Sequence, residues 1–369
     1  MTMNPAFIAG SGEATGPRHT TGLCWLLTDG SAGMLAQARA LAESLGLAHE
    51  AKKIALNRWF SWQPNAIYAA GYKHLIMDYV LDKKNSDALG EPWPPLVISC
   101  GRRAALIAMG MRHQLSTQQT AVNTRFIHIQ DPQCPPENFD LVIAMEHDKV
   151  RGTNVITTSR ALHNITPEKL EAARAQFAAR FAGYASPKVA VLLGGSTNKY
   201  TLKPSAMKKI ISSLEQLLAK TTCSLLITPS RRTGEENIRL LDSSFRRKPE
   251  SSANKNMDPG LRRDDTRIYL YDNKEENPYL GLLALADYII VTNDSVNMMS
   301  EALATGKPVY ILPLPGHQHT KPARFAEKLV SDGTCRLLGE SLQPWDYEMH
   351  EWMAELTEKV RSVLPDLLR

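Results

Sequence analysis

The sequence lacks the runs and pairs that define several large protein classes. No stretch approaches the ~18 consecutive apolar residues of a transmembrane helix, and the first twenty residues lack the basic and apolar regions of a secretory signal. The five cysteines form no CxxC pair, and several lie within apolar runs. We therefore expect no membrane span, a disordered tail at residues 1–20, and buried thiols in a reducing, cytoplasmic setting.

Motifs for metal and nucleophile chemistry are also missing. No Walker A, GxSxG, HExxH or EF-hand pattern occurs. His147, His317 and His319 do not complete a ligand set, so we expect no metal and no cofactor. The net charge of +5 is modest, and we expect no nucleic-acid partner.

What is present is alternation between apolar runs and helical patterns. The chain has 369 residues, 43% of them apolar, which suits two domains. The apolar runs predict strands that are buried on both faces, and the segments between them predict helices, as in right-handed βαβ units. The predicted strands are 23–28, 96–100, 125–130, 141–145, 189–193, 223–228, 267–271, 288–292 and 308–312, with helices that include 33–45, 167–181 and 205–219.

These two series predict an α/β protein with two doubly wound Rossmann-like domains. We place the N-terminal domain at residues 21–183 and the C-terminal domain at 187–345, joined by a short linker. Residues 243–266 lack apolar periodicity and indicate a flexible insertion. Residues 346–369 form a C-terminal segment with an amphipathic helix over 347–368. Its apolar face is expected to pack on the body of the protein, the alternative being a membrane or partner surface.

Ligands bind beyond the carboxyl ends of parallel strands, so the residues that follow each strand are the site candidates. Gly194, Gly195 and Ser196 follow one strand and could expose amides to a phosphate, although a glycine pair can also be a plain turn. Ser230, Arg231 and Arg232 follow the next strand. Their guanidinium groups match phosphate oxygens, and an exposed basic loop is the alternative.

Asp294 and Ser295 follow a third strand and open a helix that carries Glu301. The first amides of such a helix suit a diphosphate, and a carboxylate two turns along could accept hydrogen bonds from ribose hydroxyls. Asp294 as an ordinary helix cap and Glu301 as a solvated side chain are the alternatives.

The N-terminal half offers an acceptor side. Asp29 is a candidate general base or a turn residue, and Gly30 and Gly33 permit close approach of a ligand. Gly101 and Arg102 follow another strand and suit an anionic group.

His147 is the second candidate catalytic residue. It lies beside Asp148, so that the two could form a catalytic base pair or a satisfied structural pair.

These motifs together resemble the Elm-type mitochondrial-fission protein family and its bacterial relatives, over roughly residues 23–338. The resemblance is carried by Trp25-Leu26-Leu27-Thr28-Asp29-Gly30 with Gly33 and Gln37, Ile98-Ser99-Cys100-Gly101-Arg102-Arg103, His147-Asp148 with Gly152, Asn154 and Val155, Gly194-Gly195, Asn277-Pro278-Tyr279, Ala286-Asp287, and Asp294-Ser-x-x-Met-x-x-Glu301-Ala ending in Gly306-Lys307-Pro308.

The C-terminal half is also similar to the donor half of GT-B glycosyltransferases and UDP-sugar 2-epimerases. That likeness implies a GT-B-like fold and a metal-independent glycosyltransferase using a nucleotide-sugar. It also implies that Gly194, Gly195, Ser196, Asp294, Ser295 and Glu301 touch diphosphate and ribose. The acceptor would be a lipid or a glycan, and a lipid acceptor would bring peripheral contact with the inner membrane. The alternatives are a non-catalytic adaptor of the fission-factor type and a sugar-nucleotide epimerase.

Overall fold

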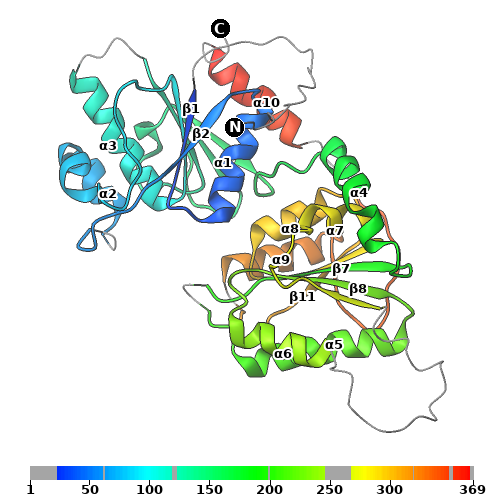
Figure 1. Cartoon of the computed structure of the whole chain (residues 1–369). Helices are drawn as coiled ribbons and strands as arrows, with labels where there is room; N and C mark the ends of the chain where they lie inside the picture. The colour runs from blue at the N-terminus through cyan, green and yellow to red at the C-terminus, as the bar shows by residue number, and fades with distance from the viewer. Residues whose placement is uncertain are drawn as a thin grey trace, which may run out of the picture.

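The computed structural model describes residues 23–60, 63–118, 123–197, 200–245, 267–318, 320–348 and 352–365. They form two six-stranded sheets in which every pairing is parallel, in the orders β2-β1-β3-β4-β5-β6 and β12-β11-β10-β7-β8-β9 (Figure 1). The predicted tail lies outside the described residues. So does the predicted insertion from residue 246 on, while its first three residues end helix α6.

The first sheet holds the expected strands and two more. Its strands β1, β3 and β5 are buried at every position, because helices cover both faces. The elements of this unit are β1 Cys24–Thr28, α1 Ala32–Ser44, β2 His49–Lys53, α2 Asn65–Ile67, η1 Tyr68–Tyr72, η2 Lys73–Leu75, η3 Ile76–Val80, β3 Leu96–Cys100, α3 Arg102–Gln118, β4 Arg125–Ile129, η4 Pro136–Asn138, β5 Leu141–Met145 and β6 Val155–Thr158.

The second sheet has α5 and α6 on one face and α7, α8 and α9 on the other, the face turned toward the first unit (Figure 1). Its elements are α4 Pro167–Phe181, β7 Lys188–Leu193, α5 Pro204–Lys220, β8 Ser224–Pro229, α6 Glu235–Phe245, β9 Ile268–Leu270, α7 Tyr279–Leu285, β10 Tyr288–Thr292, α8 Val296–Leu303, β11 Val309–Leu312, α9 Lys321–Ser331 and β12 Arg336–Leu337. The predicted α/β class with two doubly wound Rossmann-like units is confirmed.

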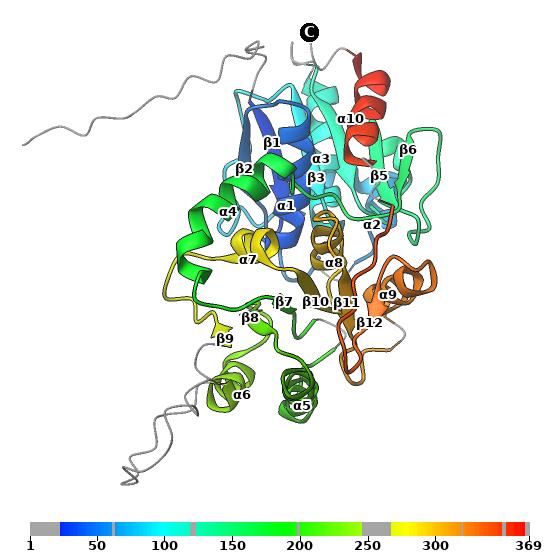
Figure 2. The same ribbon diagram turned by 90° about the vertical axis from the view of Figure 1, so that its right-hand side faces the viewer.

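Two helices pack on a different unit from the one that they adjoin on their side of the boundary expected at residues 183–187. Helix α4 precedes that boundary, and helix α10 (Trp352–Val363) follows the second unit in the chain. Helix α4 packs on α7, where a Cβ on Gly281 would lie 2.5 Å from the ring of Phe177, so α4 belongs to the second unit. Helix α10 returns to pack on α1 of the first unit (Figure 2). The predicted helix over 347–368 is described from Trp352 on, and Tyr347 is not helical. The hydroxyl of Tyr347 donates to the carbonyl of Leu303 (2.8 Å) and holds this part of the chain on the second unit.

Most of the cysteines are buried, as the sequence predicts. Cys24, Cys100, Cys223 and Cys335 are buried, Cys134 is partly buried, and none is disulfide-bonded. Within the described residues no helix is both long and apolar enough to cross a bilayer.

Candidate functional site

A cavity of about 870 Å³ lies between the two units. It is bordered by segments that follow β1, β4, β8 and β10, so the carboxyl ends of both sheets face it. Its lining comes from α1 with its N-cap and Gln130 in the first unit and from four segments of the second: Ser31, Ala32, Gly33, Met34, Ala36, Gln37, Gln130, Ser230, Arg231, Arg232, Tyr279, Asp294, Ser295, Val296, Asn297, Met298, Glu301 and Pro322.

The first turn of α8 forms the wall on the second unit. Ser295 is the N-cap, and its hydroxyl accepts a hydrogen bond from the amide of Met298 (3.4 Å). The amides of Val296 and Asn297 stand in the first turn, where no carbonyl of the helix can reach them. Both residues line the cavity, so the positive end of the helix dipole meets it.

Asp294 is engaged inside the second unit. Its side chain is fully buried and accepts hydrogen bonds from the hydroxyl of Thr292 (2.7 Å) and the amide of Gly195 (3.0 Å). The guanidinium of Arg232 lies 2.9 Å from the same carboxylate. Asp294 therefore positions the strand-end loops, and the capping role belongs to Ser295.

The predicted phosphate cradle at Gly194, Gly195 and Ser196 is corrected by these contacts. The amide of Gly194 donates to the Thr292 hydroxyl (2.8 Å), and that of Ser196 donates to the Arg232 carbonyl (2.8 Å). A Cβ on Gly194 would lie 2.0 Å from the Asp294 carboxylate, and one on Gly195 would lie 2.0 Å from the Arg232 carbonyl. The two glycines leave space for the Asp294 carboxylate and the Arg232 carbonyl. None of the three residues lines the cavity.

The two arginines after β8 reach the cavity differently. Arg232 is 38% exposed and pairs with Asp294. Arg231 is exposed, and no carboxylate among the described residues pairs with it. Ser230 lines the wall beside them, and its hydroxyl accepts from the Arg232 amide (3.2 Å). Arg231 is thus the guanidinium available to an anionic ligand.

Glu301 faces the cavity together with Tyr279, a tyrosine that the sequence analysis did not select as a site residue. The Tyr279 hydroxyl donates to Glu301 Oε2 (2.5 Å). Burial raises the pKa of Glu301 above its ordinary value, and burial, reinforced by the Glu301 charge, raises that of Tyr279. With Oε2 bound to the phenol, Oε1 is the carboxylate oxygen left for a ligand. The position of Tyr279 at the start of α7, after Pro278, was the available sequence signal.

The wall on the first unit is the N-terminal turn of α1, which meets the N-terminal turn of α8. Asn297 Nδ2 donates to the Gly33 carbonyl (2.9 Å), and Gln37 Nε2 donates to Asn297 Oδ1 (2.9 Å). A Cβ on Gly33 would lie 2.5 Å from Asn297 Nδ2, so the close approach requires glycine. Two helix N-termini therefore meet where they border the cavity.

Of the predicted acceptor-side residues, Gly33 alone lines the cavity. Asp29 is partly buried beside it, with Oδ1 accepting from the Ser31 amide (3.1 Å) and Oδ2 3.5 Å from Arg103. Gly30 is in an exposed turn with φ +82°. Gly101 has φ +87° and makes room for α1, because a Cβ there would lie 2.4 Å from Met34 Sδ.

Arg102 and His147 are placed away from the cavity lining. Arg102 donates to the Gln63 carbonyl (2.9 Å). His147 Nε2 lies 3.8 Å from Asp148 Oδ1, and Asp148 is bound by Lys321 (2.8 Å). Burial lowers the pKa of His147, and its ring packs near Phe325 of α9. The structure thus places His147 at a contact between the units, outside the cavity lining, and its catalytic role stays a prediction.

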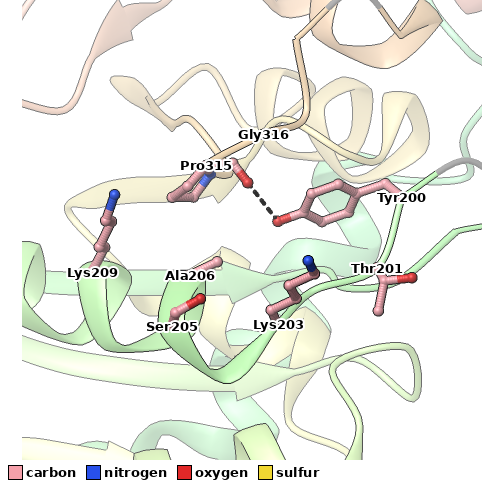
Figure 3. A pocket seen from close by; sticks show the side chains of 8 residues that line it. All are labelled: Tyr200, Thr201, Lys203, Ser205, Ala206, Lys209, Pro315 and Gly316. Atoms are coloured by element: carbon pink, nitrogen blue, oxygen red, sulfur yellow. Dashed lines mark hydrogen bonds between the residues drawn. The ribbon is translucent and has the colours of Figure 1, made fainter.

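A second, smaller cavity of about 420 Å³ opens where β7 leads into α5 (Figure 3). Lys203 and Lys209 stand on its α5 side, and the Tyr200 hydroxyl donates to the Pro315 carbonyl (3.0 Å) across it. The ring of Tyr200 meets His317 edge to face, with centroids 4.8 Å apart. None of the residues that line it was predicted from the sequence as a site residue.

Two Rossmann-like units whose strand ends border one cavity define a GT-B-type architecture. The family model described as "Mitochondrial fission ELM1" matches residues 32–364. The chain therefore belongs to the mitochondrial fission ELM1 family, as the motifs predicted.

The chain is also similar to individual proteins. The chain is 28% identical over 298 residues to mitochondrial fission protein ELM1 of Arabidopsis thaliana, covering 73% of this chain and 64% of that protein. It is 25% identical over 380 residues to uncharacterized protein RP120 of Rickettsia prowazekii, covering 92% and 98%. Among solved structures, it is similar to UDP-GlcNAc 2-epimerase from Neisseria meningitidis bound to UDP-GlcNAc (15% identity, TM-score 0.46, covering 94% of this chain and 92% of that one).

Proposed function

We propose that the chain binds a nucleoside diphosphate sugar in the cavity between its units and transfers the sugar to an acceptor. The observation that carries this proposal is the convergence of the α8 N-terminus, Arg231 and Glu301 on one cavity of about 870 Å³. Ligand pockets span ~300–1,000 Å³ and combine a few polar groups of this kind.

The diphosphate is assigned to the first turn of α8. The amides of Val296 and Asn297 and the hydroxyl of Ser295 would donate to its oxygens, and Arg231 would pair with it from the β8 end. The α1 N-terminus beside it adds a second favourable dipole. These groups stabilise the diphosphate without a cation, so we propose a metal-independent reaction.

The ribose is assigned to Glu301. Its Oε1 would accept hydrogen bonds from the ribose hydroxyls, while Tyr279 holds the other oxygen in place. Tyr279 is thus proposed as a positioning residue for the carboxylate.

The transfer step needs an acceptor hydroxyl and a base. The acceptor oxygen forms a bond to the anomeric carbon as the bond from that carbon to the diphosphate oxygen breaks. The diphosphate leaves with the electron pair, and the hydroxyl proton goes to the base. Asp29, beside the cavity-lining Ser31, is the proposed base. A lipid or glycan acceptor would approach from the first unit.

The carboxylates that line the cavity favour sugar transfer over epimerisation. The described cavity lining contains only Asp294, which is buried and engaged, and Glu301, which is held by Tyr279. An epimerase needs further acid and base groups around one pocket. The fission adaptor remains the rival function, and it requires no nucleotide.

A thermal-shift and calorimetric panel of nucleoside diphosphates and their sugars tests the proposal. A ligand that binds the folded state raises the melting temperature by mass action. Arg231→Ala should weaken the affinity roughly tenfold or more, since it removes a charged hydrogen-bond donor. Arg239→Ala is the matched control, because Arg239 is exposed on α6 and pairs only with Glu235 of its own helix among the described residues. A flat response across the panel from a folded sample would favour the adaptor.

A further inference from the structure

The segment between β2 and β3 carries an exposed aromatic surface. Trp59 is 82% exposed, Tyr79 60%, Tyr72 53% and Ile67 45%. The other exposed large apolar side chains of the described residues are spread over distant segments: Leu23, Leu337 and Val363. These four residues, all from the one segment between β2 and β3, are called the aromatic lip below. Large apolar side chains that concentrate on the exposed side of one segment indicate an interaction site.

The lip is held firmly from below. Tyr68, Ile76 and Val80 of the same segment are buried in the core of the first unit. On α3, Gly110 makes room for Ile76, since a Cβ there would lie 2.5 Å from it. Asn57 Nδ2 donates to the Tyr79 carbonyl (2.6 Å), which brings the turn that carries Trp59 next to η3. The aromatic rings are therefore presented by a packed scaffold.

The surroundings of the lip are basic. Residues 57–84 contain Arg58, Lys73, Lys83 and Lys84 against Asp78 and Asp82, a formal charge of +2 from four cations and two anions. Tryptophan and tyrosine combine an apolar ring with a polar tip, and they concentrate where a bilayer meets water. Flanking cations add attraction to anionic headgroups.

We propose that the aromatic lip docks the protein on the surface of an anionic bilayer. The lip adjoins the strand ends that face the inter-unit cavity. Asn65 Nδ2 donates to the carbonyls of Arg102 (2.8 Å) and Pro132 (2.8 Å), which follow β3 and β4, and Arg102 donates back to the Gln63 carbonyl. A docked lip would bring the first unit to the membrane. In combination with the proposed function, on which this last step rests, it would make the acceptor a lipid-borne hydroxyl.

The test is co-sedimentation of the full chain with phosphatidylcholine vesicles, with or without phosphatidylglycerol. We expect binding to the vesicles that contain phosphatidylglycerol and weakening with added salt. The double variant W59S/Y79S should lower the partition coefficient roughly tenfold or more, because it removes two large apolar contacts. The exposed control Leu337→Ser on the second unit should bind like the wild type.

Other results would overturn the docking proposal. These are the absence of wild-type binding to either vesicle, equal binding of W59S/Y79S, or a wild-type dimer in analytical ultracentrifugation that the double variant dissociates. Circular dichroism and melting temperature establish that the variants fold. The nucleotide panel is run on W59S/Y79S in parallel. Its thermal shift should be unchanged, so the failure of docking and the failure of nucleotide binding are read separately.

Discussion

Replacement of Asp294 by alanine should lower stability strongly in the absence of any ligand. The change removes the acceptor of the Gly195 amide, the Thr292 hydroxyl and the Arg232 guanidinium. Hydrogen bonds to a charged group contribute about 1.5–3 kcal/mol each, and a buried donor left unpaired costs about 1–3 kcal/mol. Thr292 keeps a contact to the Leu192 carbonyl, and Arg232, which is 38% exposed, can be rehydrated. The contributions of these two side chains to the loss of stability are therefore reduced.

The expected loss in the free energy of unfolding comes mainly from the buried Gly195 amide and from part of the Arg232 pair, and is roughly 3 kcal/mol in total. For a domain of this size, about 2–4 °C are lost per kcal/mol, which predicts a fall in melting temperature of roughly 6–12 °C. Scanning calorimetry of the ligand-free protein measures it. Asp332→Ala is the control: Asp332 is half-exposed and pairs with Lys328 on the surface, so about 1 kcal/mol or less is expected.

The same measurement decides whether Asp294 serves the fold or the ligand. If Asp294→Ala melts like the wild type and yet no longer binds nucleotide, the carboxylate contacts the ligand directly. The internal network described above would then be refuted, and the glycine-loop amides would be available to a phosphate.

Three further predictions concern buried charge and backbone geometry. Burial raises the pKa of Glu301 above 4.5, so its ionisation destabilises the folded state as pH rises. Glu301→Gln should therefore have a higher melting temperature than the wild type at about pH 7 and lose that gain at about pH 4. The same variant should bind nucleotide more weakly. Equal melting curves at both pH values would contradict this. Burial lowers the pKa of Lys307 from 10.5 to about 8, so the unfolded state binds more protons between those values. Wild-type stability relative to Lys307→Met should therefore rise over that window in urea unfolding, and a constant difference would contradict it. Gly101→Ala, at φ +87° and against Met34, should lower the free energy of unfolding by about 1–3 kcal/mol in the same assay. Gly183→Ala, with open space around it, should lower it by less than about 1 kcal/mol. Equal effects of the two changes would contradict the role of Gly101 in packing.

The strand prediction succeeded where the apolar pattern was continuous. Strands β3, β5 and β8 are buried at every position and were found from their sequence. Strand β2 was missed because its sequence, His-Glu-Ala-Lys-Lys, has no apolar run. It lies at an edge of the sheet, where most of its side chains are exposed. Its backbone pairs with β1 regardless of side-chain polarity.

The sequence predicted which residues meet at the strand ends where their place follows from strand topology alone. The sequence by itself determined two parallel sheets, and hence that Arg231, Ser295 and Glu301 would gather at one edge, because βαβ units have a fixed hand and direction. Only the tertiary structure decided the partners of those residues. Asp294 binds an amide 99 positions away, and Asn297 binds a carbonyl 264 positions away. The first contact depends on how the loops of the second unit fold together, and the second depends on how the two units pack. Neither leaves a local pattern in the chain, which is why the glycine pair was predicted as a ligand cradle.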